Sequence, residues 1–389
     1  MDGVAVISDS ADTAKIEVQP VGTRRQRNEF IQLPWKLYAG DPNWVPPLIG
    51  QQRELLNFKA HPFYNDAEIQ TFLAYRQGEP IGRIAAIVNH AHNRQAGERR
   101  GFFGFFECID DQPTADALFL AVRTWLADRN MEHIRGPVNP SLNYECGLLI
   151  DGFDSAPFFL MTYNPPYYVR LLENVGLYKA QDMYAFWGHI DMLSTLDEKV
   201  AFIAQQSQER FNVHVRQLDV NRFREEVEMF LDIYNRSLVA TWGFVPMSNS
   251  ETKHMAAGLR RLIVPELTQI AEIEGQPVGV AFCLPDFNPR IKEINGRLFP
   301  FGFIKLLRDR RSIPRVRLIS TNVIPEFQRW GISLVLLRSL AFKILQSKVQ
   351  EVEFSWVLES NSLSRASLER GGAKLTKTYR LYDGSVLAQ

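Results

Sequence analysis

The sequence predicts an α/β protein made of two copies of one domain, each with a mixed central sheet and helices on both faces. Three observations predict this fold class. The chain has 389 residues, which suits two domains of about 150–200 residues each. Two hairpin patterns, at residues 75–87 and 272–284, recur 197 residues apart. Each is followed by alternating strand and helix patterns with short links, which are typical of a sheet covered by helices.

Paired glycines and flanking motifs define the repeat. The glycines form two pairs, each 197 residues apart: Gly78 with Gly275, and Gly82 with Gly279. Upstream, WVP at 44–46 recurs as WGFVP at 242–246, and downstream LENVG at 172–176 recurs as LERGG at 368–372. Landmarks that recur at offsets of 196–198 residues indicate duplication rather than coincidence. We therefore expect a flexible N-terminal segment over residues 1–19, or an early strand there, and domains over 20–190 and 191–389.

Within each copy the elements follow one order. A helix comes first, at 222–238 in the second copy, where apolar residues recur at helical spacing. The hairpin follows, then a strand at 101–107 or 315–323. A helix at 115–129 or 332–347 comes next, and after it a strand, a short helix and a tyrosine-containing last strand. The copies differ by a long insertion in each, at 136–163 in the first and 288–314 in the second.

Composition excludes several classes of protein. Lys+Arg and Asp+Glu both number 44 and the pI is about 7.1, whereas a nucleic-acid binder usually has a basic excess. Cys108, Cys146 and Cys283 are widely spaced and show no metal-ligand spacing, so we expect reduced thiols and no metal. The N-terminus lacks a secretory pattern and no run of about 18 apolar residues occurs. We expect a cytoplasmic protein.

The most informative segment spans residues 315–340, RVRLISTNVIPEFQRWGISLVLLRSL. An apolar, β-branched strand pattern is followed by a short loop, and a long apolar helix starts directly after Gly331. A strand, a glycine-bearing turn and a helix N-terminus form an anion site, because unpaired backbone N–H groups and the helix dipole point at a bound phosphate. Gly331 allows a close backbone approach, Ser333 is small, and Arg329 adds positive charge.

This segment resembles the acyl-CoA-binding motif of the GNAT superfamily of N-acyltransferases, Q/R-x-x-G-x-G/A. It matches at Gln328 and Gly331, and Ser333 stands where the family usually has Gly or Ala. The chain's ending is also similar: a strand at 351–358, then Asn361, a helix with small residues and a tyrosine-bearing last strand. The resemblance implies two tandem GNAT-like domains, the second binding acyl-CoA as co-substrate. The residues it implies for CoA binding are Asn322, Val323, Gln328, Arg329, Trp330, Gly331, Ile332, Ser333 and Asn361.

The equivalent loop of the first copy differs. After the strand at 101–107 comes CIDDQPT, which has no glycine, and Asp110 and Asp111 stand where a pyrophosphate would lie. Two carboxylates facing a polyanion are repulsive. We therefore expect the first domain to lack a CoA site and to shape the acceptor pocket or support the second domain.

The resemblance implies direct attack of an amine on the thioester, without an acyl-enzyme. The amine must lose a proton, and the CoA thiolate benefits from protonation. Family members often have a tyrosine near the sulfur, and Tyr379 and Tyr382 are the candidates here. Three residues apart on one strand, they face opposite sides, so only one can serve. The strand at 315–323 has no Glu to act as the base.

The insertion in the first copy is the expected source of the base and of the acceptor site. Long loops in compact domains are usually functional or disordered, and the many aromatic residues between 144 and 168 argue against disorder. We expect Glu145 to act in catalysis, or else the loop only packs the two domains together. The candidates for acceptor binding are Asn139, Asn143, Tyr144, Asp151, Asp154 and Tyr163.

The predicted function is transfer of an acyl group from acyl-CoA to a primary amine. A long-chain acyl group is one of the alternatives. The chain is also similar to bacterial tandem members of the superfamily, some of which are associated with ceramide synthesis and hence lipid metabolism. A donor carried on an acyl carrier protein would use the same groove. Two alternatives remain: a non-catalytic acyl-CoA-binding or scaffold protein, and a Fem-like aminoacyl transferase, which would need a basic groove.

One further segment agrees with a lipid-like amine substrate. Residues 298–313, LFPFGFIKLLRDRRSI, combine Leu, Phe and Ile with Lys305, Arg308, Arg310 and Arg311. Apolar anchors beside a basic cluster can lie on an anionic membrane surface or meet a carrier protein. This predicts peripheral contact at the inner membrane surface, unless the segment is an amphipathic helix that covers the sheet. No feature sets the oligomeric state.

Overall fold

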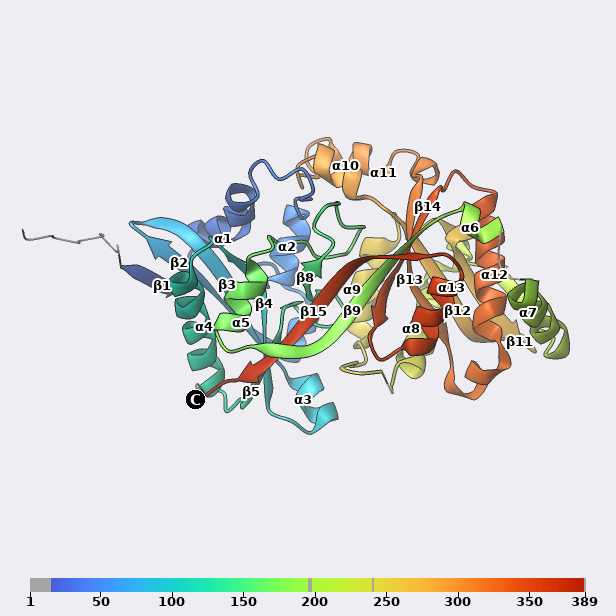
Figure 1. The fold of residues 1–389 in the computed structure, drawn as a ribbon, viewed down its shortest axis with the longest axis horizontal. Coiled ribbons are helices and arrows are strands. Elements are labelled where there is room, and N and C mark those ends of the chain that lie inside the picture. Colours follow the sequence, from blue (N-terminus) through green and yellow to red (C-terminus); the bar gives the residue numbers. More distant parts are fainter. Residues whose placement is uncertain (1–14, 195–197, 240, 388–389) are drawn as a thin grey trace, which may run out of the picture.

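In the computed structural model, residues 15–194, 198–239 and 241–387 are described (Figure 1). One 13-stranded sheet runs through both halves, in the order β1-β2-β3-β4-β5-β15-β9-β14-β13-β12-β11-β10, and β8 pairs with β15. Strands from residues before 190 are β1 (Ile16–Pro20), β2 (Ala67–Arg76), β3 (Glu79–Asn89), β4 (Arg100–Cys108), β5 (His133–Gly136), β6 (Val138–Asn139), β7 (Glu145–Cys146), β8 (Leu148–Asp151) and β9 (Tyr178–His189). The others are β10 (His214–Gln217), β11 (Thr268–Ile273), β12 (Gln276–Pro285), β13 (Arg315–Val323), β14 (Glu351–Leu358) and β15 (Lys374–Ser385).

The repeated hairpins form as expected, as β2–β3 and β11–β12. Their turns lie one residue earlier than the glycine-to-proline pattern suggested. Gln77 and Gly78 have φ of 52° and 81°, and Glu274 and Gly275 have 51° and 76°. Two successive positive φ values define the tight turn whose twist matches that of the flanking strands. This backbone requirement explains why a glycine recurs at both positions.

The last strand of each half completes the sheet of the other half. β9 pairs with β14 of the second half, and β15 pairs with β5 of the first. β9 and β15 also pair with each other along most of their length, and they cross the middle of the molecule side by side (Figure 1). The two halves expected at 20–190 and 191–389 therefore share one sheet rather than forming separate sheets.

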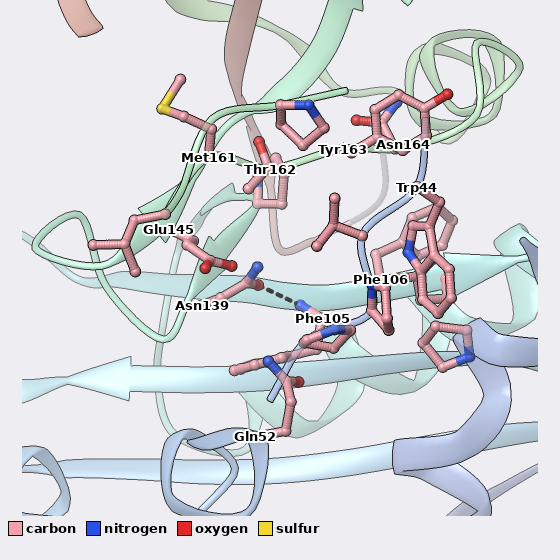
Figure 2. A pocket seen from close by; sticks show the side chains of 18 of the residues that line it. Trp44, Gln52, Phe105, Phe106, Asn139, Glu145, Met161, Thr162, Tyr163 and Asn164 are labelled. Atoms are coloured by element: carbon pink, nitrogen blue, oxygen red, sulfur yellow. Dashed lines mark hydrogen bonds between the residues drawn. The ribbon is translucent and has the colours of Figure 1, made fainter. Parts of the chain in front are cut away.

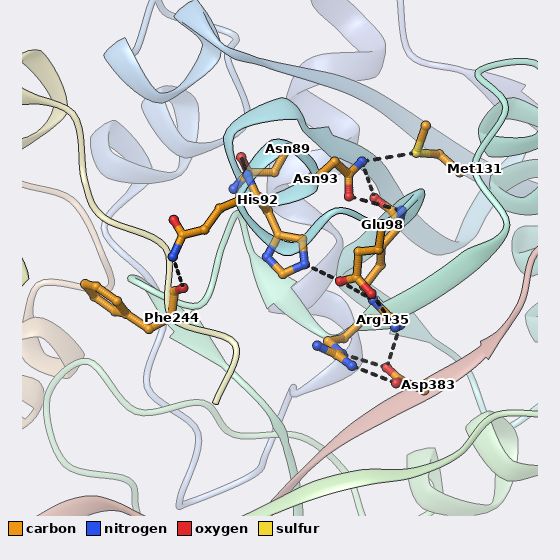
Figure 3. A network of polar contacts seen from close by, with 10 residues as sticks. Asn89, His92, Asn93, Glu98, Met131, Arg135, Phe244 and Asp383 are labelled. Carbon is orange, nitrogen blue, oxygen red and sulfur yellow. Dashed lines mark hydrogen bonds and ion pairs between the residues drawn. The ribbon is translucent and has the colours of Figure 1, made fainter. Parts of the chain in front are cut away.

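An ionic network fixes the end of β15 to the first half (Figure 3). Asp383 accepts hydrogen bonds from Nε and Nη2 of Arg135, both at 2.7 Å, and lies 3.2 Å from Arg100 Nη1. Arg100 also pairs with Glu98, which accepts from His92 Nε2. These side chains are largely buried, so the charge of Asp383 balances cations from two neighbouring strands.

Helices cover both faces of the first half. α4 and α5 contribute to one hydrophobic core and α1 to the other. α4 starts at Gln112, three residues before the expected position, because Asp111 caps it. The helices are α1 (Arg24–Leu37), α2 (Ile49–Leu55), α3 (His90–Ala96), α4 (Gln112–Ala127), α5 (Tyr168–Asn174), α6 (Asp191–Ser194), α7 (Glu198–Arg210), α8 (Phe223–Ser237), α9 (Asn249–Leu259), α10 (Asn288–Glu293), α11 (Gly302–Leu307), α12 (Ile332–Leu345) and α13 (Ser362–Arg370).

The N-terminal segment, the three cysteines and the helix lengths can each be compared with what the sequence predicts. The N-terminal segment contains the early strand that was one of its two expected forms: Ile16–Pro20 forms β1 and pairs with β2. Residues 1–14 lie outside the described part. The three cysteines are buried and unpaired. Among the described residues, no helix is long and apolar enough to span a bilayer.

Candidate active site

Two neighbouring strands part in each half. β4 and β5 pair in parallel only at residues 100–102 and 133–135, and β13 and β14 only at 315–318 and 351–354. In the first half the insertion closes this gap. Asn139 Oδ1 accepts a hydrogen bond from the Phe105 backbone N–H at 2.7 Å, and a Cβ on Gly104 would lie 1.7 Å from the Val138 carbonyl oxygen. β6 therefore packs directly against β4.

In the second half, polar groups line β13 where it has parted from β14. Ser320 Oγ, Thr321 Oγ1 and Asn322 Oδ1 are buried and have no hydrogen-bond partner in the described part of the chain. Asn322 Nδ2 donates to Ser237 at 2.8 Å, so its carbonyl side is the free one. Buried polar atoms without partners are rare in folded proteins. Their presence beside a parted strand edge suits a ligand that hydrogen-bonds there.

The loop from β13 to α12 has the geometry of an anion site. Gly331 has φ of 73° and stands at the N-cap, where no side chain caps α12. The N–H groups of the first turn are then left for a ligand. Arg329 is exposed and makes no ion pair within the described residues, and Ser333 is half-buried. Gly331 has a second reason to be glycine, since a Cβ there would lie 2.4 Å from Ser207 Oγ of α7.

The other candidates for CoA binding lie at the end of β13, in this loop and its helix, and at the start of α13. Gln328 Nε2 donates to the Val323 carbonyl at 3.1 Å and so holds the loop in shape. Trp330 stacks on Phe211, with ring centroids 4.2 Å apart. Val323 and Ile332 are buried in the core, so only their backbones face outward. Asn361 caps α13 by accepting from the Ser364 N–H.

At the equivalent position of the first half, Asp111 caps α4. Its carboxylate accepts hydrogen bonds from the Thr114 backbone N–H at 3.0 Å and from Arg76 Nη2 at 2.7 Å. Asp110 pairs instead with Arg170 on α5. The helix N-terminus that could hold a phosphate is thus occupied by the protein's own carboxylate.

A cavity of about 140 Å³ lies between the insertion, β4, the segment after α1 and α10 (Figure 2). Glu145 and Asn139 lie near each other on one side of it, and Tyr163 and Trp44 line the opposite side. Burial raises the pKa of the Glu145 carboxyl to about 7, although the nearby Arg317 guanidinium opposes the shift. A carboxylate with this pKa can accept a proton near neutral pH.

A second carboxylate, Glu107 of β4, faces the same cavity. It accepts hydrogen bonds from the hydroxyls of Tyr38 and Tyr168 at 2.8 and 2.9 Å. Burial raises the pKa of Glu107, while the adjacent Arg83 opposes the rise. These three partners occupy Glu107, whereas the Glu145 side chain has no hydrogen bond within the described residues. Glu145 is therefore the carboxylate left available to a substrate.

Arg317 of β13 connects this cavity to the second half. The guanidinium, 3% exposed, donates to the carbonyls of Phe159 and Leu160 in the insertion at 3.1 and 3.0 Å. It also donates to Ser355 Oγ at 2.8 Å. Glu353, Tyr379 and Glu145 all act electrostatically on it. The charge of Arg317 thus sits between the cavity and the parted strands.

The two candidate tyrosines face opposite sides of β15, as predicted. Tyr379 packs in the core shared with Leu149 and Cys146, and its buried hydroxyl has no partner among the described residues. Tyr382 lies in the core under α4 and α5, and its hydroxyl donates to Glu173 at 3.4 Å. Burial raises the pKa of Tyr379 well above its usual value, so the phenol stays protonated.

The structure gathers only some of the residues proposed for the acceptor. Asn139, Glu145 and Tyr163 line one cavity. The others lie outside its lining: Asn143 donates to the Val245 carbonyl, Tyr144 donates to Glu251, and Asp151 and Asp154 are exposed. Residues that sequence reasoning missed include Glu107, Arg317 and Glu353. Each is a charged residue inside an apolar strand, and that signal could have identified them.

No family model matches the sequence. The chain is 35% identical over 384 residues to the bacterial ceramide synthase of Caulobacter vibrioides, covering 95% of this chain and 97% of that protein. It is 35% identical over 363 residues to protein YghO of Escherichia coli, covering 92% of each. The chain belongs to the bacterial ceramide synthase family.

Solved structures show the fold of this family member. A tandem GNAT protein from the clavulanic acid biosynthesis pathway superposes with a TM-score of 0.57 at 11% identity, covering 96% of this chain and all of that one. A GCN5-related N-acetyltransferase from Sphaerobacter thermophilus gives 0.53 at 14% identity, covering 96% of both chains. The tandem GNAT fold expected from the sequence is confirmed. The fold and the family indicate an acyltransferase, and no cluster of metal-ligating side chains occurs among the described residues.

Proposed function

We propose that this protein transfers an acyl group from acyl-CoA to a primary amine, with Glu145 as the base. The observation that carries the proposal is the unpaired Glu145 carboxylate in the cavity, whose pKa burial raises to about 7. An amine is protonated at neutral pH and cannot attack until it loses a proton. The fold and the relatives support an acyltransferase, and Glu145 supplies the proton acceptor that the strand at 315–323 lacks.

The parted edge of β13 and the open N-terminus of α12 suit the donor. Acyl-CoA supplies an activated thioester carbonyl. The free N–H groups after Gly331, with Arg329 beside them, would hold the pyrophosphate. The unpartnered groups of Ser320 and Asn322, which share one face of β13, would hydrogen-bond the arm beside the strand edge. An acyl carrier protein could present the same arm, and the pyrophosphate cradle favours CoA.

Each proton has a place in the proposed reaction. The amine nitrogen attacks the thioester carbon, the N–C bond forms and the C–S bond breaks. Glu145 takes the proton that the bound ammonium loses before the attack and passes it to water, and it then takes the second proton, which the nitrogen loses as the C–S bond breaks. Tyr379, whose hydroxyl is buried, protonated and without a partner, gives its proton to the leaving sulfur. Arg317, between these groups, would steady the negative charge that builds up there.

The acceptor we propose is a long-chain amino alcohol, because a relative at 35% identity is named a bacterial ceramide synthase. The cavity of about 140 Å³ is polar on the Glu145 and Asn139 side. This volume holds several water-sized groups and so accommodates the amino head of such a substrate. Asn139, beside Glu145, and Tyr163, across the cavity, would contact the head.

The test measures release of free CoA thiol with long-chain and acetyl donors, in the presence of a long-chain amino alcohol. We expect turnover with the long-chain donor that falls about 10²–10⁴-fold in Glu145→Gln. Asp151→Asn, an exposed carboxylate on the same insertion, is the matched control and should keep full activity. Acyl-CoA binding without thiol release from any amine would refute catalysis and identify a binding protein instead.

A further inference from the structure

The insertion of the second half presents bare aromatic side chains to solvent. Phe299 is 82% exposed, Phe301 73% and Ile304 53%. With Phe303, they fall within six consecutive residues at the start of α11. The Phe299 and Phe303 rings lie 6.1 Å apart and so cluster with each other. Scattered exposed apolar residues are ordinary, but a cluster of large ones marks a contact surface.

The same segment carries a strong positive charge in a chain whose formal net charge is zero. Residues 290–311 hold seven basic and two acidic residues, a net charge of +5. Three of the basic side chains, Arg297, Lys305 and Arg308, are exposed and form no ion pair with any described residue. Free cations beside exposed aromatics complement a negatively charged apolar boundary.

Residues 288–311 form a platform that is fixed to the body of the protein. Leu306 and Ile291 point into the core, 5% and 4% exposed. Arg290 donates to the carbonyls of Leu306 and Asp309 at 3.1 Å each, which closes the segment into a loop. The exposed aromatics therefore face outward because the loop is anchored from its other side.

The platform borders the cavity. Asn288 and Ile291 of α10 line the cavity wall. Ile49 donates its N–H to the Gly296 carbonyl at 3.1 Å, and Trp35 Nε1 donates to Asn295 Oδ1 at 2.7 Å. α10 and α11 stand together at one edge of the molecule, above the junction of the halves (Figure 1). A surface that meets the platform would lie beside the segment that encloses the substrate head.

We propose that residues 297–308 dock this protein on an anionic lipid bilayer, with Phe299, Phe301 and Ile304 in the headgroup boundary. Arg297, Lys305 and Arg308 would meet the lipid phosphates. Each basic residue near an anionic surface strengthens binding roughly fivefold, and the aromatics add apolar burial. The exposed aromatics favour a bilayer over an acidic carrier protein, since a purely ionic partner would leave them in water.

The experiment is co-sedimentation of the full chain with vesicles of phosphatidylcholine, alone or mixed with phosphatidylglycerol. We expect binding to the mixed vesicles that weakens with salt. The double variant Phe299→Ser/Phe301→Ser should bind roughly tenfold or more weakly. Lys305→Glu/Arg308→Glu should bind roughly a hundredfold more weakly.

Matched controls lie on α12 and just after it. Phe342, 58% exposed, and Lys348, exposed and without an ion pair in the described chain, are far from the platform in sequence. Phe342→Ser and Lys348→Glu should bind vesicles as the unchanged protein does. The proposal is overturned if the unchanged protein does not sediment with mixed vesicles, or if the Phe299 and Phe301 variant sediments equally well. Binding of an acyl carrier protein through the basic residues, without binding to vesicles, would also overturn it. No acyl donor is present, so the result is independent of acyl transfer.

Discussion

Asp111 and Gly331 hold the same position at the start of two equivalent helices, and only Asp111 places a carboxylate there. Asp111 accepts the Thr114 N–H of α4, whereas α12 has no side-chain cap. The duplicated fold thus leaves the N-terminus of α12 open to an anion, whereas the N-terminus of α4 is capped by the protein's own Asp111 carboxylate. This asymmetry predicts one CoA site per chain.

Native mass spectrometry with CoA tests that stoichiometry. We expect one equivalent bound to the unchanged protein. Ser333→Glu should weaken binding roughly tenfold or more, because a carboxylate in the first turn of α12 repels the pyrophosphate and competes for the same N–H groups. Ser333→Gln, with the same size and no charge, is the control. Two equivalents, or equal binding by the two variants, would contradict the assignment.

The raised pKa of Glu145 predicts the pH dependence of the reaction. The base must be ionised, and its pKa of about 7 means that half of it is protonated near neutrality. kcat/KM should therefore fall tenfold per pH unit below about 7. The amine has a much higher pKa, near the ~10 of an alkylamine, so its effect on the rate can be separated from that of Glu145. Rates measured from pH 5.5 to 9 check this.

Glu353 provides the control for that profile. Burial also raises the pKa of Glu353 to about 7, but its carboxylate accepts from Ser355 Oγ and does not line the cavity. The Glu145→Gln variant should lose the fall in kcat/KM below about pH 7, along with most of its activity. Glu353→Gln should keep that fall. If the fall instead disappears with Glu353, Glu145 is not the base.

The two tyrosines of β15 predict opposite outcomes for the same change. Tyr379→Phe removes a buried hydroxyl without a described partner, so the free energy of unfolding should stay equal or rise slightly. Its rate should drop about 10–100-fold if the phenol protonates the leaving sulfur. Tyr382→Phe removes a 3.4 Å contact to Glu173 and an interaction with Arg380, and it should keep the rate. Urea unfolding and thiol release measure both. An active Tyr379→Phe would exclude the phenol as the acid.

The duplicated fold was predictable because it depends on local backbone requirements. Gly78 and Gly275 must both adopt positive φ, so the repeat survives in the sequence. The exchange of β9 and β15 was not predictable in the same way. Either strand could pair within its own half by its apolar pattern, and the choice is made by long-range contacts such as Asp383 with Arg135.

Active-site residues were only partly predictable from the sequence, because hydrogen bonds elsewhere in the fold occupy some of the polar side chains. Glu145 was identified from the insertion and lies in the cavity. Asn143 and Tyr144, equally polar neighbours, instead bond to Val245 and Glu251 more than 100 residues away. Sequence indicates that a segment is polar, but the tertiary partners decide which of its side chains remain free.

The Asp383 network predicts how strongly the exchange of strands stabilises the protein. Asp383→Asn leaves the largely buried Arg135 and Arg100 without their shared counter-charge. Breaking a buried pair from one side typically costs about 3–5 kcal/mol, and we expect a loss of about 2–4 kcal/mol because these side chains retain some exposure. Since β15 completes the first half and β9 the second, both halves should unfold in one transition. Urea unfolding followed by tryptophan fluorescence and circular dichroism measures this.

An exposed pair of the same kind is the control. Glu228 on α8 meets Arg224 at 3.3 Å with both side chains at least half exposed, so Glu228→Gln should change stability by no more than about 0.5 kcal/mol. A similar small effect for Asp383→Asn would mean that strand pairing alone holds β15. Two separate transitions for the unchanged protein would mean that the halves fold independently despite the shared sheet, and would refute the coupling.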